Sequence, residues 1–124
     1  MAGVKPLRWV ASAKTDLSAM PIEVRRGVGY ALFAAQRGEK HDDAKVLKGF
    51  GDAGVLEVIA RHDGDLFRAV YTVRFGDVVY VLHVFQKKSK RGIATPKKEL
   101  ELIRKRLKLA EEDHKQWRAR EGQA

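Results

Sequence analysis

The clearest structural pattern of the chain lies in the stretch VLEVIARHDGDLFRAVYTVRFGDVVYVLHVFQ, residues 55–86. It holds three runs rich in β-branched and aromatic residues, which favour strands. Asp63-Gly64 separates the first two runs, and this dipeptide is a strong signal for a two-residue hairpin turn. Gly76-Asp77 separates the second run from the third. The stretch therefore predicts an antiparallel meander with strands at residues 55–62, 66–74 and 78–86.

Two-residue turns would fix the register of this meander, and cross-strand partners share a face of the sheet. Arg61 is then expected opposite Leu66, and Arg68 opposite both Ile59 and Phe85. One face is mixed in character and is expected to be open to solvent: Glu57, Ile59, Arg61, Arg68, Val70, Thr72, His83, Phe85 and Lys87. The other face is apolar and is expected to meet helices: Leu56, Val58, Ala60, Phe67, Ala69, Tyr71, Val73, Tyr80, Leu82 and Val84.

The sequence on both sides of the meander predicts helices. Apolar residues recur at helical spacing within residues 15–37, and Pro21 is expected to interrupt that helix. A second apolar stripe follows Thr95, a suitable capping residue, and Pro96, which suits a first helical position. Residues 38–54 are polar and rich in glycine, which is typical of a loop, and residues 7–11 suit an edge strand.

These elements predict one α+β domain over residues 1–118, followed by a frayed tail at residues 119–124. The expected core of that domain is a small antiparallel sheet of three or four strands, with the helices packed on one face. A chain of 124 residues is long enough for one such domain.

Composition narrows the function. The formal net charge of +9 favours a polyanionic partner such as nucleic acid or the ribosome. The chain has no cysteine, and its four histidines do not stand at metal-ligand spacing, so we expect no metal and no cofactor. No apolar run is long enough to span a membrane, and no signal peptide is evident. We therefore expect a cytoplasmic protein.

Basic residues gather at one end of the mixed face. Arg61, Arg68 and Lys87 are expected to converge around Phe85, and such cations bind phosphates while an aromatic ring stacks on an unpaired base. The following loop, Lys87-Lys88-Ser89-Lys90-Arg91, extends this charge. A solvated charged loop is the alternative interpretation of that run. His83 on the same face is either a half-buried sheet histidine or an acid-base group.

Three motifs carry a family resemblance: LFRAVY at residues 66–71, VYVLHVFQKKS at residues 79–89, and Thr95-Pro96 with Glu99. Together they resemble the phage-related HigB-like branch of the RelE/HigB toxin superfamily. In that branch an R-x-x-Y strand precedes a strand ending L-H-x-F-x-K-K-S and a T-P-x-x-E segment. The resemblance implies a RelE-like fold of the microbial ribonuclease type. It also implies a type II toxin, an endoribonuclease or mRNA interferase that often acts in the ribosome, and an antitoxin partner that is commonly a helix-turn-helix repressor.

The resemblance also assigns residues. The strand arginine of the family falls on Arg68, its basic pair falls on Lys87 and Lys88, and Arg61 fits a further basic position. One lysine of this pair, Lys87 or Lys88, is the candidate base, and His83 is the alternative acid or base. Residues expected to contact RNA are Phe85, Gln86, Ser89, Lys90 and Arg91.

This chain departs from the family at two points. Glu57 and Ile59 stand where some members carry lysines, and no tyrosine follows Tyr80. The implied reaction is attack of the substrate's own 2′-hydroxyl on the adjacent phosphate, which requires no metal. Because the mixed face is expected to be open, Arg68→Ala should impair cleavage while folding survives.

Two other functions fit the same charge pattern. A binding module would hold RNA, DNA or the ribosome on the basic face without cutting. A phage-derived structural protein would use that face to meet an acidic partner. Cleavage of mRNA by the purified protein would separate the first hypothesis from both alternatives.

Overall fold

A five-stranded mixed sheet forms the centre of the computed structural model, which describes residues 3–52, 54–87 and 95–122, with Lys87 described only as backbone. The strand order is β1-β5-β4-β3-β2, with β1 parallel to β5 and every other neighbouring pair antiparallel. The strands are β1 (Leu7–Trp9), β2 (Ala44–Val46), β3 (Val55–His62), β4 (Asp65–Thr72) and β5 (Val79–Lys87). The predicted count of three or four strands was too low, because the glycine-rich segment expected to be a loop contains β2.

The predicted register of the meander is confirmed for the pairing of β3 with β4, and for the pairing of β4 with β5 from Leu66 to Val70. Arg61 pairs with Leu66, and Arg68 pairs with both Ile59 and Phe85. Asp63 and Gly64 both have positive φ, at 50° and 83°, as a two-residue turn of this type requires. The predicted hairpin therefore forms as the sequence indicated.

A register shift between Val70 and Tyr71 changes the remainder of the predicted faces. Tyr71 pairs with Val81 rather than Leu82, so β5 carries one extra residue at this point. Tyr80 and Leu82 consequently belong to the core on the face of Val70, whereas Tyr71 stays in the opposite core. The prediction that Tyr80 and Leu82 share the face of Tyr71 was wrong, for this reason.

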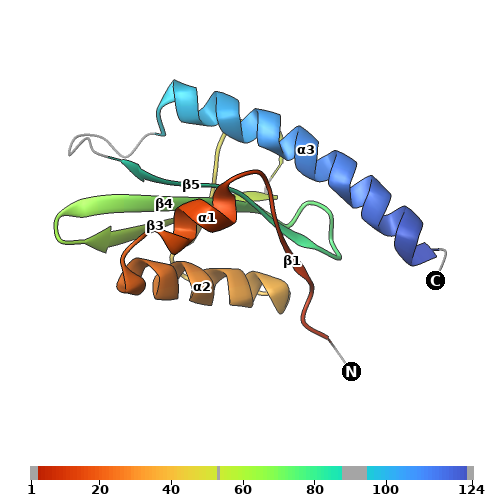
Figure 1. Cartoon of the computed structure of the whole chain (residues 1–124), viewed down its shortest axis with the longest axis horizontal. Coiled ribbons are helices and arrows are strands. Elements are labelled where there is room, and N and C mark those ends of the chain that lie inside the picture. Colours follow the sequence, from red (N-terminus) through yellow and green to blue (C-terminus); the bar gives the residue numbers. More distant parts are fainter. Residues whose placement is uncertain (1–2, 53, 88–94, 123–124) are drawn as a thin grey trace.

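Helices cover both faces of the sheet rather than one (Figure 1). Helices α1 (Ala13–Ser18) and α2 (Ile22–Gln36) pack on one face, and α3 (Lys97–Gly122) packs on the other. The mixed face is therefore covered by α3, and the expectation that it is open was wrong. None of the helices in the described part of the chain contains the long apolar stretch that a membrane span requires.

The helix boundaries follow from local sequence. Pro21 separates α1 from α2 as predicted, and its carbonyl accepts a hydrogen bond from the Arg25 amide at 3.0 Å. Helix α3 begins at Lys97, directly after Pro96, whose carbonyl accepts from the Leu100 amide at 3.0 Å. The helix continues to Gly122 and so includes residues 119–122.

The C-terminal half of α3 is held to the sheet by charged and aromatic contacts. Asp113 accepts hydrogen bonds from Arg8 Nε at 2.6 Å and from the Tyr80 hydroxyl at 2.7 Å. At the next residue of α3, His114 Nε2 lies 2.6 Å from Asp77 Oδ1, and the His114 ring stacks on Phe75. These contacts fix the direction of α3 and thereby position its N-terminal turn over the other end of the sheet.

The Asp113 contact predicts a measurable pH dependence. The hydrogen bond from Arg8 lowers the pKa of Asp113 below its ordinary value of 3.8, against the opposing effect of partial burial. A carboxyl group whose pKa is lower in the folded chain than in the unfolded chain stabilises the fold at pH values above its unfolded pKa. This contribution is lost as the pH falls through the folded pKa. Asp113→Asn should therefore destabilise the protein near neutral pH by about 0.2–1 kcal/mol, the range of solvent-screened pairs, and by less in acid.

Urea unfolding at neutral pH and below pH 3.8 would measure this difference. Asp65→Asn, an exposed carboxylate at the start of β4, is the matched control. Equal dependence of the unfolding free energy on pH in the two variants would contradict the assignment.

Candidate functional site

The candidate site lies at the end of the sheet where β3 and β5 finish and β4 begins. Leu66 on β4 pairs with Arg61 on β3 and with Lys87 on β5, so these three positions are neighbours. Arg61 and Gln86 are exposed, and Phe85 is half-buried. The sheet therefore gathers the predicted basic and aromatic positions at one end, which is called the basic end below.

Arg68 is buried rather than presented to a ligand. Its side chain has 0% exposure, and its Nη1 donates to both Glu57 carboxylate oxygens, at 2.9 and 3.0 Å. Thr95, in the segment before α3, also contacts this pair, because its hydroxyl donates to Glu57 Oε2 at 2.9 Å. Because α3 covers this face, Arg68 supports the site from beneath, and the expectation of an accessible guanidinium is corrected.

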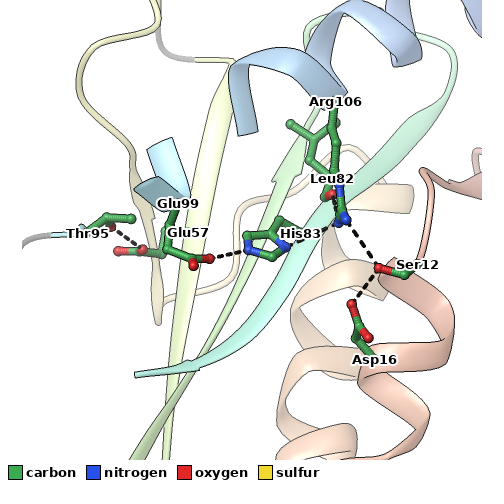
Figure 2. A network of polar contacts seen from close by, with 8 residues as sticks. All are labelled: Ser12, Asp16, Glu57, Leu82, His83, Thr95, Glu99 and Arg106. Carbon is green, nitrogen blue, oxygen red and sulfur yellow. Dashed lines mark hydrogen bonds and ion pairs between the residues drawn. The ribbon is translucent and has the colours of Figure 1, made fainter. Parts of the chain in front are cut away.

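His83 forms the centre of a polar network on the same face (Figure 2). Its Nε2 contacts Glu99 Oε2 in the first turn of α3, and its Nδ1 lies 3.2 Å from Arg106 Nη1. A guanidinium only donates hydrogen bonds, so Nδ1 accepts and the proton of the neutral ring lies on Nε2, directed at Glu99. The His83 ring also stacks on Phe85, with centroids 4.7 Å apart.

The network continues from His83 to the opposite side of the sheet. Arg106 Nη1 donates to the Leu82 carbonyl at 3.1 Å, and its Nη2 donates to the Ser12 hydroxyl at 3.2 Å. Ser12 in turn donates to Asp16 Oδ2 at 2.7 Å (Figure 2). Arg106 thus joins α3, β5 and the start of α1, and it fixes the orientation of the His83 ring.

Two hollows flank the basic end. The first, of about 580 Å³, is lined among others by Asp16, His83, Phe85, Gln86 and Glu99, and is called the His83 hollow. The second, of about 660 Å³, lies between β2, β3 and the start of α3 and includes Arg61; it is called the Arg61 hollow. The predicted residues His83, Phe85 and Gln86 therefore share one hollow, whereas Arg61 faces the other.

Several predicted residues fall outside this description. Lys88, Ser89, Lys90 and Arg91 lie outside the described residues. Lys87 is placed at the end of β5 by its backbone pairing with Leu66. Within the described part of the chain, no group of three or more histidine and acidic side chains could hold a metal ion.

The His83–Glu99 pair is the part of the site that is best suited to acid-base chemistry. The Glu99 side chain keeps 23% of its surface exposed, whereas the His83 side chain keeps only 8%. A carboxylate that is oriented by an imidazole and open to a hollow can exchange a proton with a ligand there. Sequence reasoning placed Glu99 only inside the T-P-x-x-E motif and gave it no role, and it found no signal for Arg106 or Ser12.

Similar solved structures identify the class of fold. A double arginine-to-alanine mutant of the E. coli toxin RelE, in the free state, matches with a TM-score of 0.50 and 22% identity over 66% of this chain and 82% of that chain. The toxin-antitoxin complex RelBE2 from Mycobacterium tuberculosis matches with a TM-score of 0.46 and 22% identity over 72% and 98% of the two chains. No curated protein sequence matches this chain. The match to the E. coli toxin shows that the fold is of the RelE type.

The family follows from the sequence match. Residues 15–108, more than half of the chain, match the family described as phage derived protein Gp49-like. The chain therefore belongs to the Gp49-like family, and the RelE-like fold that the family resemblance implied is confirmed.

Proposed function

We propose that this protein is the toxin of a type II toxin-antitoxin system and cleaves mRNA as an endoribonuclease. The observation that carries the proposal is the His83–Glu99 pair, which opens onto a hollow beside Phe85 at the basic end of a RelE-type fold. Family membership and the net charge of +9 support an RNA substrate.

The proposed reaction is a transesterification. The substrate 2′-oxygen forms a bond to the adjacent phosphorus, and the bond from phosphorus to the 5′-oxygen breaks. The products are a 2′,3′-cyclic phosphate and a 5′-hydroxyl, so the 2′-hydroxyl proton must leave and the 5′-oxygen must gain one. The site therefore needs a base, an acid and positive charge around the pentacoordinate phosphorane.

Residues at the basic end can supply these three functions. Glu99 accepts the 2′-hydroxyl proton, and the Nε2 proton of His83 holds its carboxylate in place. Lys87 and Lys88 stabilise the phosphorane, and one of their ammonium groups protonates the 5′-oxygen. Arg68 acts by holding Glu57 beneath the site.

The remaining residues of the proposed site bind the substrate. The half-buried ring of Phe85 supports an unpaired base in the His83 hollow, and exposed Gln86 offers hydrogen bonds there. Ser89, Lys90 and Arg91 follow in sequence and extend the contacts along the RNA backbone. Arg61 binds a phosphate on the other side of the basic end.

Two partners complete the proposal. The ribosome in the cytoplasm presents the mRNA, and its own RNA attracts a protein of this charge. A cognate helix-turn-helix antitoxin covers part of the basic surface through acidic segments, and charge complementarity makes that association fast and sensitive to salt. Co-expression with such a partner should give a complex that survives purification at moderate salt.

Incubation of the purified protein with translating ribosomes, followed by mapping of mRNA 5′ ends, tests the proposal. Wild-type protein should produce new ends inside the coding region. Lys87→Ala should lower the rate about 10²-fold, the scale of losing one group that stabilises charge or transfers a proton. Lys14→Ala on the exposed surface of α1 is the control and should cleave normally. A wild-type protein that binds ribosomes and leaves mRNA intact would favour the binding-module function instead.

A further inference from the structure

The Arg61 hollow is a second cavity, and Arg61 is the one described residue of its lining to which the proposed function gives a contact with the substrate. It has a volume of about 660 Å³, and side chains of β2, β3 and the start of α3 line it. Glu57 also lines this hollow, and its carboxylate accepts hydrogen bonds from Arg68 and Thr95. The hollow therefore adjoins the candidate site through the buried ion pair beneath the basic end.

Three cations line this hollow: Lys45, Lys48 and Arg61. All three are exposed, and within the described part of the chain none of them forms an ion pair. Lys45 pairs across the sheet with Glu57, whose carboxylate is already held by Arg68. The three cations are therefore available to an anionic ligand.

The rest of the lining suits the other parts of a nucleotide. Val46, Ile59 and Leu100 give an aliphatic surface, and Val46 is 43% exposed. Asp42 and Asp43 contribute carboxylates, which repel phosphate but accept hydrogen bonds from the amino groups of bases. Cations, an apolar surface and acceptors in one hollow match a ligand with a phosphate and a flat base that carries an amino group.

We propose that the Arg61 hollow binds an unpaired nucleotide of the RNA substrate, next to the nucleotides held at the basic end. Lys45, Lys48 and Arg61 hold its phosphates, and its base packs on Val46 and Ile59. This inference rests on the proposed function for the identity of the RNA. It adds a substrate-binding role for β2 and an expected preference for cytosine over uracil, because only cytosine carries the amino group that Asp42 and Asp43 can accept.

Binding of a labelled 2′-O-methyl oligoribonucleotide, measured by fluorescence anisotropy, tests the proposal. The methyl group blocks the attacking hydroxyl, so binding is measured without cleavage. The triple variant K45A/K48A/R61A should bind on the order of 50-fold more weakly at ~0.15 M salt, with a salt slope smaller by about 2, since each phosphate contact on a single strand contributes about 0.7. An oligocytidine should bind wild type more tightly than an oligouridine of equal length.

The matched control is the triple variant K14A/R26A/K105A, which removes the same charge from exposed positions outside both hollows. Circular dichroism of both triple variants checks their folding. Equal affinity and equal salt slope in the two triple variants would overturn the inference. Competition by free cytidine monophosphate as strong as that by the oligocytidine would also overturn it, because the hollow would then be a mononucleotide site.

The two proposals can fail separately. If K45A/K48A/R61A loses RNA affinity and the wild type never cleaves mRNA, the nucleotide site stands and the ribonuclease function does not. If the wild type cleaves mRNA and K45A/K48A/R61A binds and cleaves like the control triple variant, the ribonuclease function stands and the nucleotide site does not.

Discussion

Arg68→Ala is expected to lower the free energy of unfolding by about 3–5 kcal/mol, the cost of removing one partner from a buried ion pair. Arg68 has no exposed surface, and it donates to both oxygens of the Glu57 carboxylate. The variant would leave Glu57 with only the Thr95 hydroxyl among these partners. Urea unfolding monitored by circular dichroism measures the effect.

Two further variants make that result specific. Arg61→Ala removes an arginine from the exposed end of the neighbouring strand and should change stability by no more than about 0.5 kcal/mol. The double variant E57L/R68M replaces the pair with apolar side chains and should recover most of the loss, as buried pairs often allow. If Arg68→Ala is as stable as Arg61→Ala, the pair does not support the fold.

Glu99→Gln is expected to lower the single-turnover rate of mRNA cleavage by about 10²–10⁴-fold, the scale of losing general acid-base catalysis. The amide oxygen can still accept the hydrogen bond from His83 Nε2, so the geometry survives while the proton acceptor is lost. Binding of 2′-O-methyl RNA should therefore be unchanged. The variant separates a chemical role for Glu99 from a purely structural one.

Glu101→Gln is the control, because Glu101 is exposed on the same helix and lies outside both hollows. It should cleave at the rate of the wild type. A Glu99→Gln variant that also cleaves at that rate would remove Glu99 from the mechanism and leave Lys87 or Lys88 as the base.

The central meander was predictable because its signals are local. Asp63-Gly64 fixed the first turn, and the pairing of Arg68 with Ile59 followed from it. The bulge in β5 gave no such signal, because VYVLHVF is mostly apolar on both sides and does not show which residue is extra. Strand β2 was missed because three residues in a polar, glycine-rich segment carry almost no pattern, and tertiary pairing with β3 determines their structure.

The error about the open face has one physical origin. Glu57, Arg68 and His83 make that face look polar in sequence, and polar faces usually meet solvent. In the structure Glu57 neutralises Arg68 and Glu99 pairs with His83, so α3 can cover them. The residues that neutralise these charges are distant from them in sequence, as Arg106 and Ser12 are from each other. The periodicity of the sequence does not reveal such pairs.

The chemistry of the RNA ends shows whether this protein cleaves mRNA by attack of the 2′-hydroxyl. Wild-type protein is incubated with translating ribosomes, and the new 3′ and 5′ ends of the mRNA are identified chemically. We expect 2′,3′-cyclic phosphate and 5′-hydroxyl ends, with a yield that falls sharply in Glu99→Gln and not in Glu101→Gln. Intact mRNA, or fragments that carry 3′-hydroxyl and 5′-phosphate ends, would contradict it.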